Sequence, residues 1–74
     1  MPHVNVKHFP APLAQERAAE LVTAITEAVT RAFGCEPGVV SIALEPVDPR
    51  AWQDEVYAPE IVERGHLLHK TPSY

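Results

Sequence analysis

The sequence is short of cysteine, of basic residues and of long apolar runs, and each shortage excludes a class of protein. Cys35 is the only cysteine among 74 residues, so no disulfide can form within the chain. Six Lys and Arg against ten Asp and Glu give a net charge of −4 with His neutral, and they form no basic stripe of the kind that nucleic acids require. No apolar run approaches the roughly 20 residues that cross a bilayer. We therefore expect neither a nucleic-acid nor a membrane function.

The length predicts one small domain, residues 1–74, whose core needs help. A domain this small buries only about 60% of its unfolded surface, and such chains usually depend on disulfides, a metal or oligomerisation. His66 and His69 lie three apart, but no third ligand accompanies them at the spacing of a metal site. We expect no bound metal, and oligomerisation is the remaining means of stabilisation.

The start of the chain bears on its location. Met1-Pro2-His3 lacks the charged and apolar regions of a signal peptide. A free cysteine is typical of a reducing compartment. Together these features predict a cytoplasmic protein.

Apolar periodicity predicts a strand, a long helix and a second strand. Residues alternate from Pro2 to Phe9 with Val at the centre, which indicates a strand. From about Leu13 to Phe33 apolar residues recur at helical spacing, and Gly34 follows as a stop signal. The run from Val39 to Leu44 is short, β-branched and nearly continuous, which favours a strand buried on both faces.

Prolines divide the remaining third of the chain. Glu45-Pro46 is predicted to stop the second strand, and Asp48-Pro49 to open a short helical turn through Trp52. Pro59 is predicted to begin another short helix that runs to His69.

The fold class that follows is α+β, built on a β-α-β unit. A helical crossover makes the two strands parallel and the connection right-handed. One helix covers one face of the two-stranded sheet and leaves the other bare, and a sheet that small is unstable alone. We therefore predict that a homodimer completes the fold.

Pro2 is the first candidate for chemistry. Removal of Met1 by an aminopeptidase, which requires a small second residue, would expose a secondary amine at the start of the first strand. An apolar environment disfavours the charged form of an amine and lowers its pKa. An amine that is neutral near pH 7 is a competent general base.

The order and spacing of these segments resemble the 4-oxalocrotonate tautomerase family, within the tautomerase superfamily. Pro2-His3-Val4-Asn5-Val6-Lys7 is similar to the family's opening strand, Glu16-Arg17 to Phe33 to its helix, and Val39 to Leu44 to its second strand. The ending resembles that of the dimeric bacterial subgroup, in the segments Ser41-Ile42-Ala43-Leu44, Trp52-Gln53, Ala58-Pro59 and Lys70-Thr71-Pro72-Ser73-Tyr74.

The resemblance implies a cofactor-independent keto–enol tautomerase, an isomerase acting on a small molecule. Pro2 would be the catalytic base, and Trp52 would form an apolar wall that keeps the amine desolvated. The arginines that bind the substrate's carboxylates in typical members are replaced here by Pro12 and Ser41. Neither can form a bidentate pair with a carboxylate, so a monocarboxylate or an arylpyruvate enol is the more suitable substrate.

Two residues are candidates for the missing polar contacts. Arg50, two residues before Trp52, is a candidate cation, with a solvated turn residue as the alternative. Ser41 is a candidate hydrogen-bond donor to substrate, with a locally satisfied hydroxyl as the alternative. His3, next to Pro2, is a candidate for tuning the amine.

Two other functions fit the same pattern. The Pro2 amine could serve a hydratase, dehalogenase or decarboxylase, because a positioned amine supports several reactions. A dimeric β-α-β module without catalysis is the third possibility, and retention of Met1 would favour it.

Overall fold

The computed structural model describes residues 1–74 and divides them into two units. The first comprises Met1–Val6 and Ala11–Glu45, and the second comprises Lys7–Pro10 and Pro46–Tyr74. In chain order the elements are β1 (His3–His8), α1 (Gln15–Phe33), the 3-10 turn η1 (Pro37–Val39), β2 (Ser41–Pro46), the 3-10 turn η2 (Pro49–Ala51), the π-helix η3 (Gln53–Val62) and the 3-10 turn η4 (Gly65–Leu67). The single domain over 1–74 stays a prediction.

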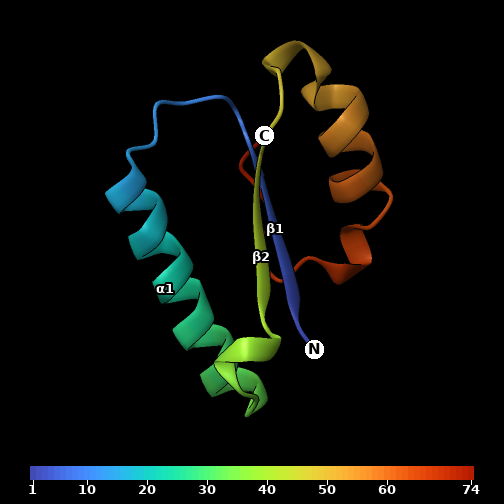
Figure 1. Ribbon diagram of the computed structural model, residues 1–74. Coiled ribbons are helices and arrows are strands. Elements are labelled where there is room, and N and C mark those ends of the chain that lie inside the picture. The colour runs from blue at the N-terminus through green and yellow to red at the C-terminus, as the bar shows by residue number, and fades with distance from the viewer. The chain divides into compact units, whose positions relative to one another are not determined.

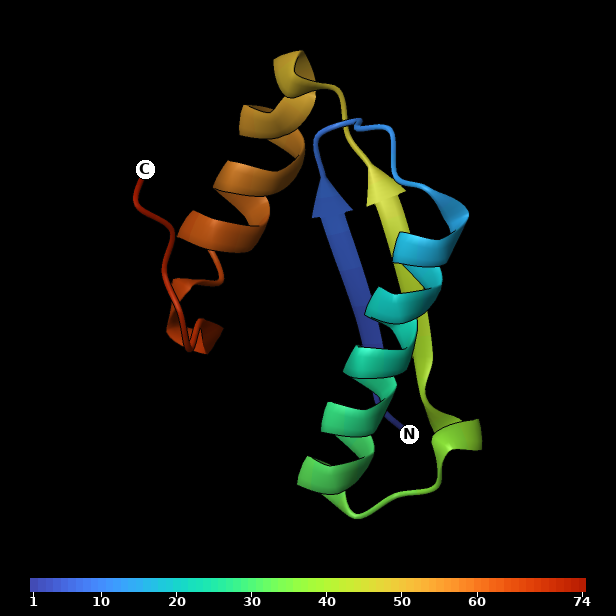
Figure 2. The same ribbon diagram turned by 90° about the vertical axis from the view of Figure 1, so that its left-hand side faces the viewer.

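The strands β1 and β2 and the helix α1 form the predicted β-α-β unit. β1 and β2 are hydrogen-bonded neighbours. The amide of Ser41 donates to the carbonyl of Pro2 at 3.1 Å, and the amide of Val47 donates to that of His8 at 2.8 Å. The two strands therefore advance in the same direction, and α1 runs along one face of the pair (Figures 1 and 2). The predicted α+β fold with parallel strands is confirmed.

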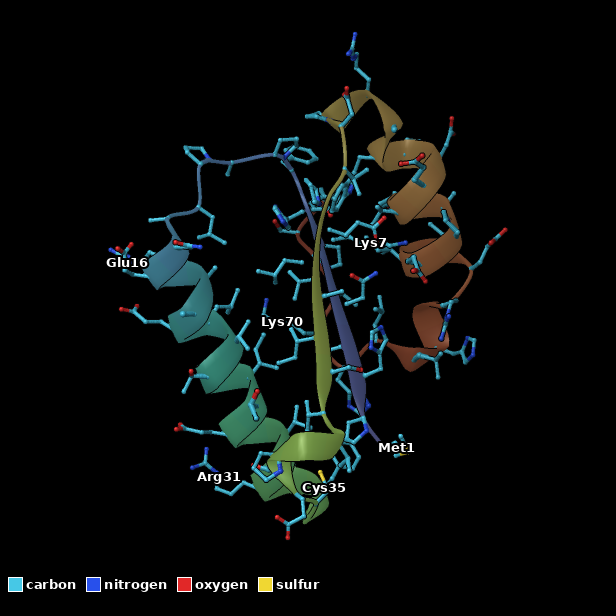
Figure 3. The ribbon with its side chains drawn as sticks, viewed as in Figure 1. Met1, Lys7, Glu16, Arg31, Cys35 and Lys70 are labelled. Carbon is cyan, nitrogen blue, oxygen red and sulfur yellow. The ribbon has the colours of Figure 1, made fainter.

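Helix α1 ends as its sequence predicts and begins two residues later than expected. Gly34 adopts a left-handed conformation with φ of 64°, which glycine tolerates without the steric cost of a side chain. Its amide donates to the carbonyl of Thr30 at 2.9 Å and caps the helix. Glu16 in the first turn and Arg31 in the last turn (labelled in Figure 3) complement the helix dipole.

The second strand differs from its prediction in two ways. β2 starts at Ser41 and includes Pro46, whereas Val39 belongs to the preceding turn. Exposed residues alternate with half-buried Ile42 and Leu44, so the prediction of a strand buried on both faces is wrong. The reason is that a single helix covers a single face. Pro46 is tolerated because both strands of a two-stranded sheet are edge strands, which accommodate proline.

The second unit confirms one predicted turn and corrects the next element. Asp48 caps η2, its Oδ1 accepting the amide of Arg50 at 2.8 Å, as predicted. The helix expected from Pro59 to His69 is wrong, because Pro59 lies inside η3. This helix closes with a bond from the amide of Glu63 to the carbonyl five residues back, at 3.0 Å. A π-helix has wider turns than an α-helix, and it accommodates a proline that would clash with an α-helix interior.

Within the second unit, the C-terminal segment contacts Lys7 and Phe9 at the end of the first strand. Lys7 Nζ pairs with Glu60 Oε2 at 3.2 Å, and the rings of Phe9 and Trp52 are 5.0 Å apart. The expectation of a bare face opposite α1 stays a prediction. None of the helices has the length and apolar composition needed to cross a membrane.

The shortage of buried side chains leads to a prediction about assembly. No residue of the first unit is buried, and Val47 and Val56 are the buried residues of the second. On α1, Leu21 remains 38% exposed and Phe33 72%. A second copy that covers such apolar surface would supply the missing burial. We predict a homodimer by light scattering at micromolar concentration. A stable monomer would contradict this prediction. A hexamer would contradict the resemblance to the dimeric subgroup but not the resemblance to the family.

Candidate active site

Pro2 is fixed at the head of the sheet by its own carbonyl. That oxygen accepts the amide of Ser41 at 3.1 Å, and the residue is half-buried directly before β1. The proline nitrogen is three covalent bonds away from this anchored oxygen. Met1, which acylates that nitrogen, is fully exposed (Figure 3). While Met1 is attached the nitrogen is an amide and has no basic lone pair.

The side chain of Ser41 pairs with that of His3, the residue that follows Pro2. Its Oγ lies 2.6 Å from Nδ1 of His3, and both side chains are exposed. Further along the same face, Asn5 Nδ2 donates to Glu45 Oε1 at 3.0 Å. The serine is therefore satisfied by a side chain of the neighbouring strand. The sequence places His3 beside Pro2, but it gives no sign of the pairing of His3 with Ser41.

The guanidinium of Arg50 is hydrogen-bonded to Asp48, the residue that caps the same turn. Its Nη2 lies 3.0 Å from Asp48 Oδ2 and its Nε 3.3 Å from Asp48 Oδ1, while its side chain is 90% exposed. The two side-chain bonds make a bidentate pair. They lower the pKa of the Asp48 carboxyl below its ordinary value, with help from the Arg50 amide, and raise the pKa of the guanidinium. A substrate carboxylate would have to compete with Asp48 for this fork.

The Asp48–Arg50 pair has a measurable pH signature. Because the pair favours ionised Asp48, its contribution is present at neutral pH and is lost as the pH falls through the lowered pKa of Asp48. We predict that Arg50→Gln raises this pKa towards the ordinary value, measured by NMR titration of the side-chain carboxyl. An unchanged pKa in Arg50→Gln would show that the amide bond alone sets it.

Trp52 lies in an aromatic groove of the second unit. Its ring meets Phe9 at 90° with centroids 5.0 Å apart, and its Nε1 donates to the Tyr74 hydroxyl at 3.2 Å. Tyr57 stacks at a tilt on Tyr74, with 5.8 Å between centroids. The groove has a volume of about 520 Å³, within the usual range of ligand pockets, and is lined by Lys7, His8, Phe9, Trp52 and Tyr74.

Trp52 was predicted from the sequence as a pocket residue, whereas its aromatic partners were not. The chain has five aromatic residues, two Phe, two Tyr and one Trp, and all except Phe33 gather in the second unit. Because the chain has few aromatic residues and each buries a large apolar area, their positions indicate where apolar contact area is concentrated.

The four predicted site residues fall into two pairs. Pro2 and Ser41 belong to the first unit, where a hydrogen bond joins them. Arg50 and Trp52 belong to the second unit, on either side of Ala51 in the turn that follows β2.

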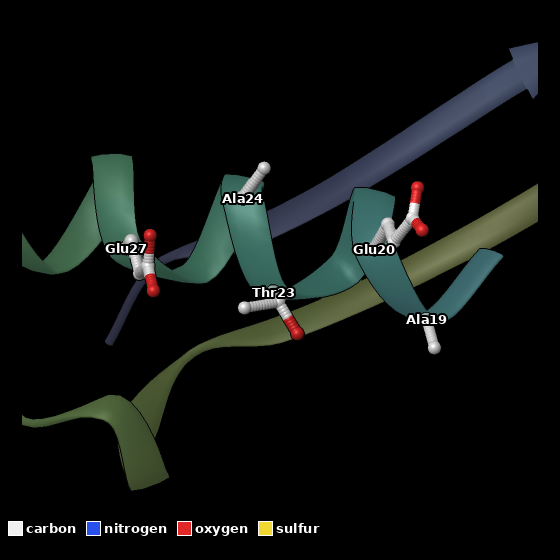
Figure 4. Close-up of a pocket in the computed structure, with 5 residues that line it drawn as sticks. All are labelled: Ala19, Glu20, Thr23, Ala24 and Glu27. Carbon is white, nitrogen blue, oxygen red and sulfur yellow. The ribbon is translucent and has the colours of Figure 1, made fainter. Parts of the chain in front are cut away.

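A second hollow of the structure contains none of these four residues. A depression of about 440 Å³ is lined by exposed residues of α1 alone, namely Ala19, Glu20, Thr23, Ala24 and Glu27 (Figure 4). Its two carboxylates are unsuited to an anionic ligand. The chain contains no group of three His, Cys, Asp or Glu side chains that could hold a metal ion.

Comparison with known proteins places the fold in a class. The family model described as "Tautomerase enzyme" matches residues 2–57. The chain therefore belongs to the tautomerase family of isomerases, as the opening strand, helix and second strand indicated. It is 35% identical over 74 residues to Tautomerase PptA of Pectobacterium carotovorum, covering 100% of this chain and 97% of the relative. The proteins of the same name from Klebsiella pneumoniae and Escherichia coli are 40% and 34% identical over the same spans.

Proposed function

We propose that this protein interconverts the enol and keto forms of a small 2-oxo acid such as an arylpyruvate, with the Pro2 amine as general base and no cofactor. The observation that carries the proposal is the anchored position of Pro2, whose carbonyl is bonded to Ser41 at the head of the sheet. The family match begins at this same residue. Removal of Met1 converts an amide into a secondary amine at a half-buried, fixed position.

The proposed step moves one proton between two atoms of the substrate. In the enol-to-keto direction, the neutral Pro2 amine accepts the hydroxyl proton while the C=O bond forms. The resulting ammonium then returns that proton to the neighbouring carbon as the C=C bond is lost. Atoms and charge balance without an oxidant or a metal, and the reverse sequence removes the carbon proton. A base fixed beside the substrate is suited to both directions.

The surroundings favour a monocarboxylate with an apolar body. Pro12 and Ser41 stand at the positions where the resemblance implies arginines, and the guanidinium of Arg50 is bonded to Asp48. Trp52 and its aromatic partners offer an apolar wall that suits an aryl group. Ser41 and Arg50 are the proposed polar contacts to substrate, Arg50 after exchange of its partner.

The proposal is tested on the purified protein as it is produced. Mass spectrometry reports whether Met1 is present, and the decay of an enol's absorbance reports the reaction. We expect an active sample to lack Met1. A sample that retains Met1 quantitatively and still ketonises enols at the same rate contradicts the proposal.

A further inference from the structure

The aromatic groove of the second unit holds a phenol hydroxyl whose hydrogen has no partner within the chain. The indole Nε1 of Trp52 can only donate, so the oxygen of Tyr74 is the acceptor in their 3.2 Å bond. None of the other side-chain hydrogen bonds reaches this hydroxyl. Tyr74 also lines the groove, so it brings a free hydrogen-bond donor to the wall of an apolar site.

Tyr74 is held in the groove by its side chain rather than by its backbone. No backbone hydrogen bond involves residues 69–74. The ring instead lies against that of Tyr57, with 5.8 Å between centroids and 36° between planes. This contact and the bond from Trp52 together hold the hydroxyl in place. Because Tyr74 remains 65% exposed, it is accessible to a small molecule that enters the groove.

The other polar side chains that line the groove are engaged by the chain itself. Lys7 Nζ donates to Glu60 Oε2 at 3.2 Å. Nδ1 of His8 lies 2.8 Å from the carbonyl oxygen of Phe9, and because a carbonyl only accepts, this nitrogen carries the hydrogen of the neutral ring. Neutral His8 therefore keeps no free donor, and the charge of Lys7 is balanced by a carboxylate. Tyr74 is the neutral side-chain donor that the groove offers to a ligand.

We infer that Tyr74 is a specificity-determining residue, whose hydroxyl donates a hydrogen bond to an acceptor atom on the substrate's aryl ring. The rings of Trp52 and Phe9 supply the apolar contact that any aryl group can use. The phenol hydroxyl adds a directional contact that only a ring bearing an acceptor, such as an ether oxygen, can complete. This inference rests on the proposed tautomerase reaction and makes arylpyruvate enols with an acceptor substituent its preferred substrates.

The experiment compares the enols of para-methoxyphenylpyruvate and para-ethylphenylpyruvate, whose substituents are nearly equal in size while only the methoxy group has an acceptor oxygen. The measured quantity is the ratio of their kcat/KM values, methoxy over ethyl. Tyr74→Phe keeps the ring and removes the donor, so it should lower this ratio roughly 2- to 10-fold, the usual effect of one neutral hydrogen bond. Comparing the ratio between native chain and variant cancels any intrinsic difference between the two enols. The meta-substituted pair is measured in the same way, and a fall in either pair supports the inference.

Tyr57→Phe is the matched control, because it removes the hydroxyl of the chain's other tyrosine and keeps the ring against which Tyr74 lies. It should leave both ratios unchanged. Trp52→Phe breaks the bond to Tyr74 but keeps the phenol hydroxyl, so it should lower the ratio less than Tyr74→Phe does. An unchanged ratio in Tyr74→Phe for both pairs would overturn the inference. So would an equal fall in Trp52→Phe, because the bond between the two residues would then be the cause.

Binding of unreactive probes separates this inference from the proposed reaction. Trp52 is the only tryptophan of the chain, so its fluorescence reports occupancy of the groove by para-methoxyphenylacetate or para-ethylphenylacetate, which have no 2-oxo group. We expect Tyr74→Phe to weaken binding of the methoxy probe relative to the ethyl probe by the same factor. If a chain blocked ahead of Pro2 turns over enols at the native rate while this preference persists, the proposed reaction fails and the inference on the groove stands. If the two probes lose affinity equally in Tyr74→Phe, the inference on the groove fails and the proposed reaction is unaffected.

Discussion

Blocking the Pro2 amine should lower kcat for enol ketonisation by about 10²–10⁴-fold, the usual contribution of a positioned general base. The block is an extra residue ahead of Pro2 that the aminopeptidase leaves in place. It turns the nitrogen into an amide while leaving the carbonyl of Pro2 free to accept the Ser41 amide. The fold should therefore survive, and the loss should fall on kcat rather than on KM.

Pro2→Ala is the informative comparison for this loss. It leaves a primary amine at the same backbone position after Met1 is removed, and a primary amine still accepts a proton. Its kcat should therefore fall less than that of the blocked chain. Thermal unfolding of the three proteins checks that β1 is intact in each. Equal rates in the native and blocked chains, across several enols, would mean that Pro2 is only the residue that precedes a strand.

The parts of this fold that sequence predicted are those set by local pattern. The alternation around Val4 and Val6 predicted β1, and the helical spacing of apolar residues from Leu21 to Phe33 predicted α1. Gly34 ends this helix in the left-handed conformation that glycine tolerates. Pro2 was proposed as the base from its position in the chain alone, and this role stays a prediction. Each of these inferences needed a window of a few residues.

The parts that sequence missed depend on residues brought together from far apart. His3 and Ser41 are 38 positions apart, and their contact exists because the register of β1 against β2 places them side by side. Trp52 and Tyr74 are 22 positions apart. No periodicity reports such pairs. Pro59 was misread for a different reason, since a proline signals a helix start by local statistics and here sits within a π-helix.

Removal of the Trp52 ring is the second large effect that we expect. Trp52→Ala eliminates the perpendicular contact with Phe9 and the bond to the Tyr74 hydroxyl, and with them the wall of the groove. Burying an aromatic group contributes about 1.5–3 kcal/mol, so an aryl enol that uses this wall should lose roughly 10- to 150-fold in kcat/KM. A small aliphatic enol, which has no aryl group to place there, should lose less.

Two further variants separate the wall from the stability of the second unit. Trp52→Phe keeps an apolar ring but removes the Nε1 donor, and Tyr74→Phe removes the hydroxyl that accepts from it. Each variant should lower the free energy of unfolding by about 1 kcal/mol, the typical value of one hydrogen bond. The double variant should lower it by about the same amount, because the two substitutions remove the same hydrogen bond. Both should preserve selectivity for the aryl enol, measured as the ratio of kcat/KM values.

If Trp52→Ala unfolds in urea as the native chain does and slows aryl and aliphatic enols equally, Trp52 does not contact the substrate. If it instead lowers the aryl rate alone, the groove is where the aryl group binds.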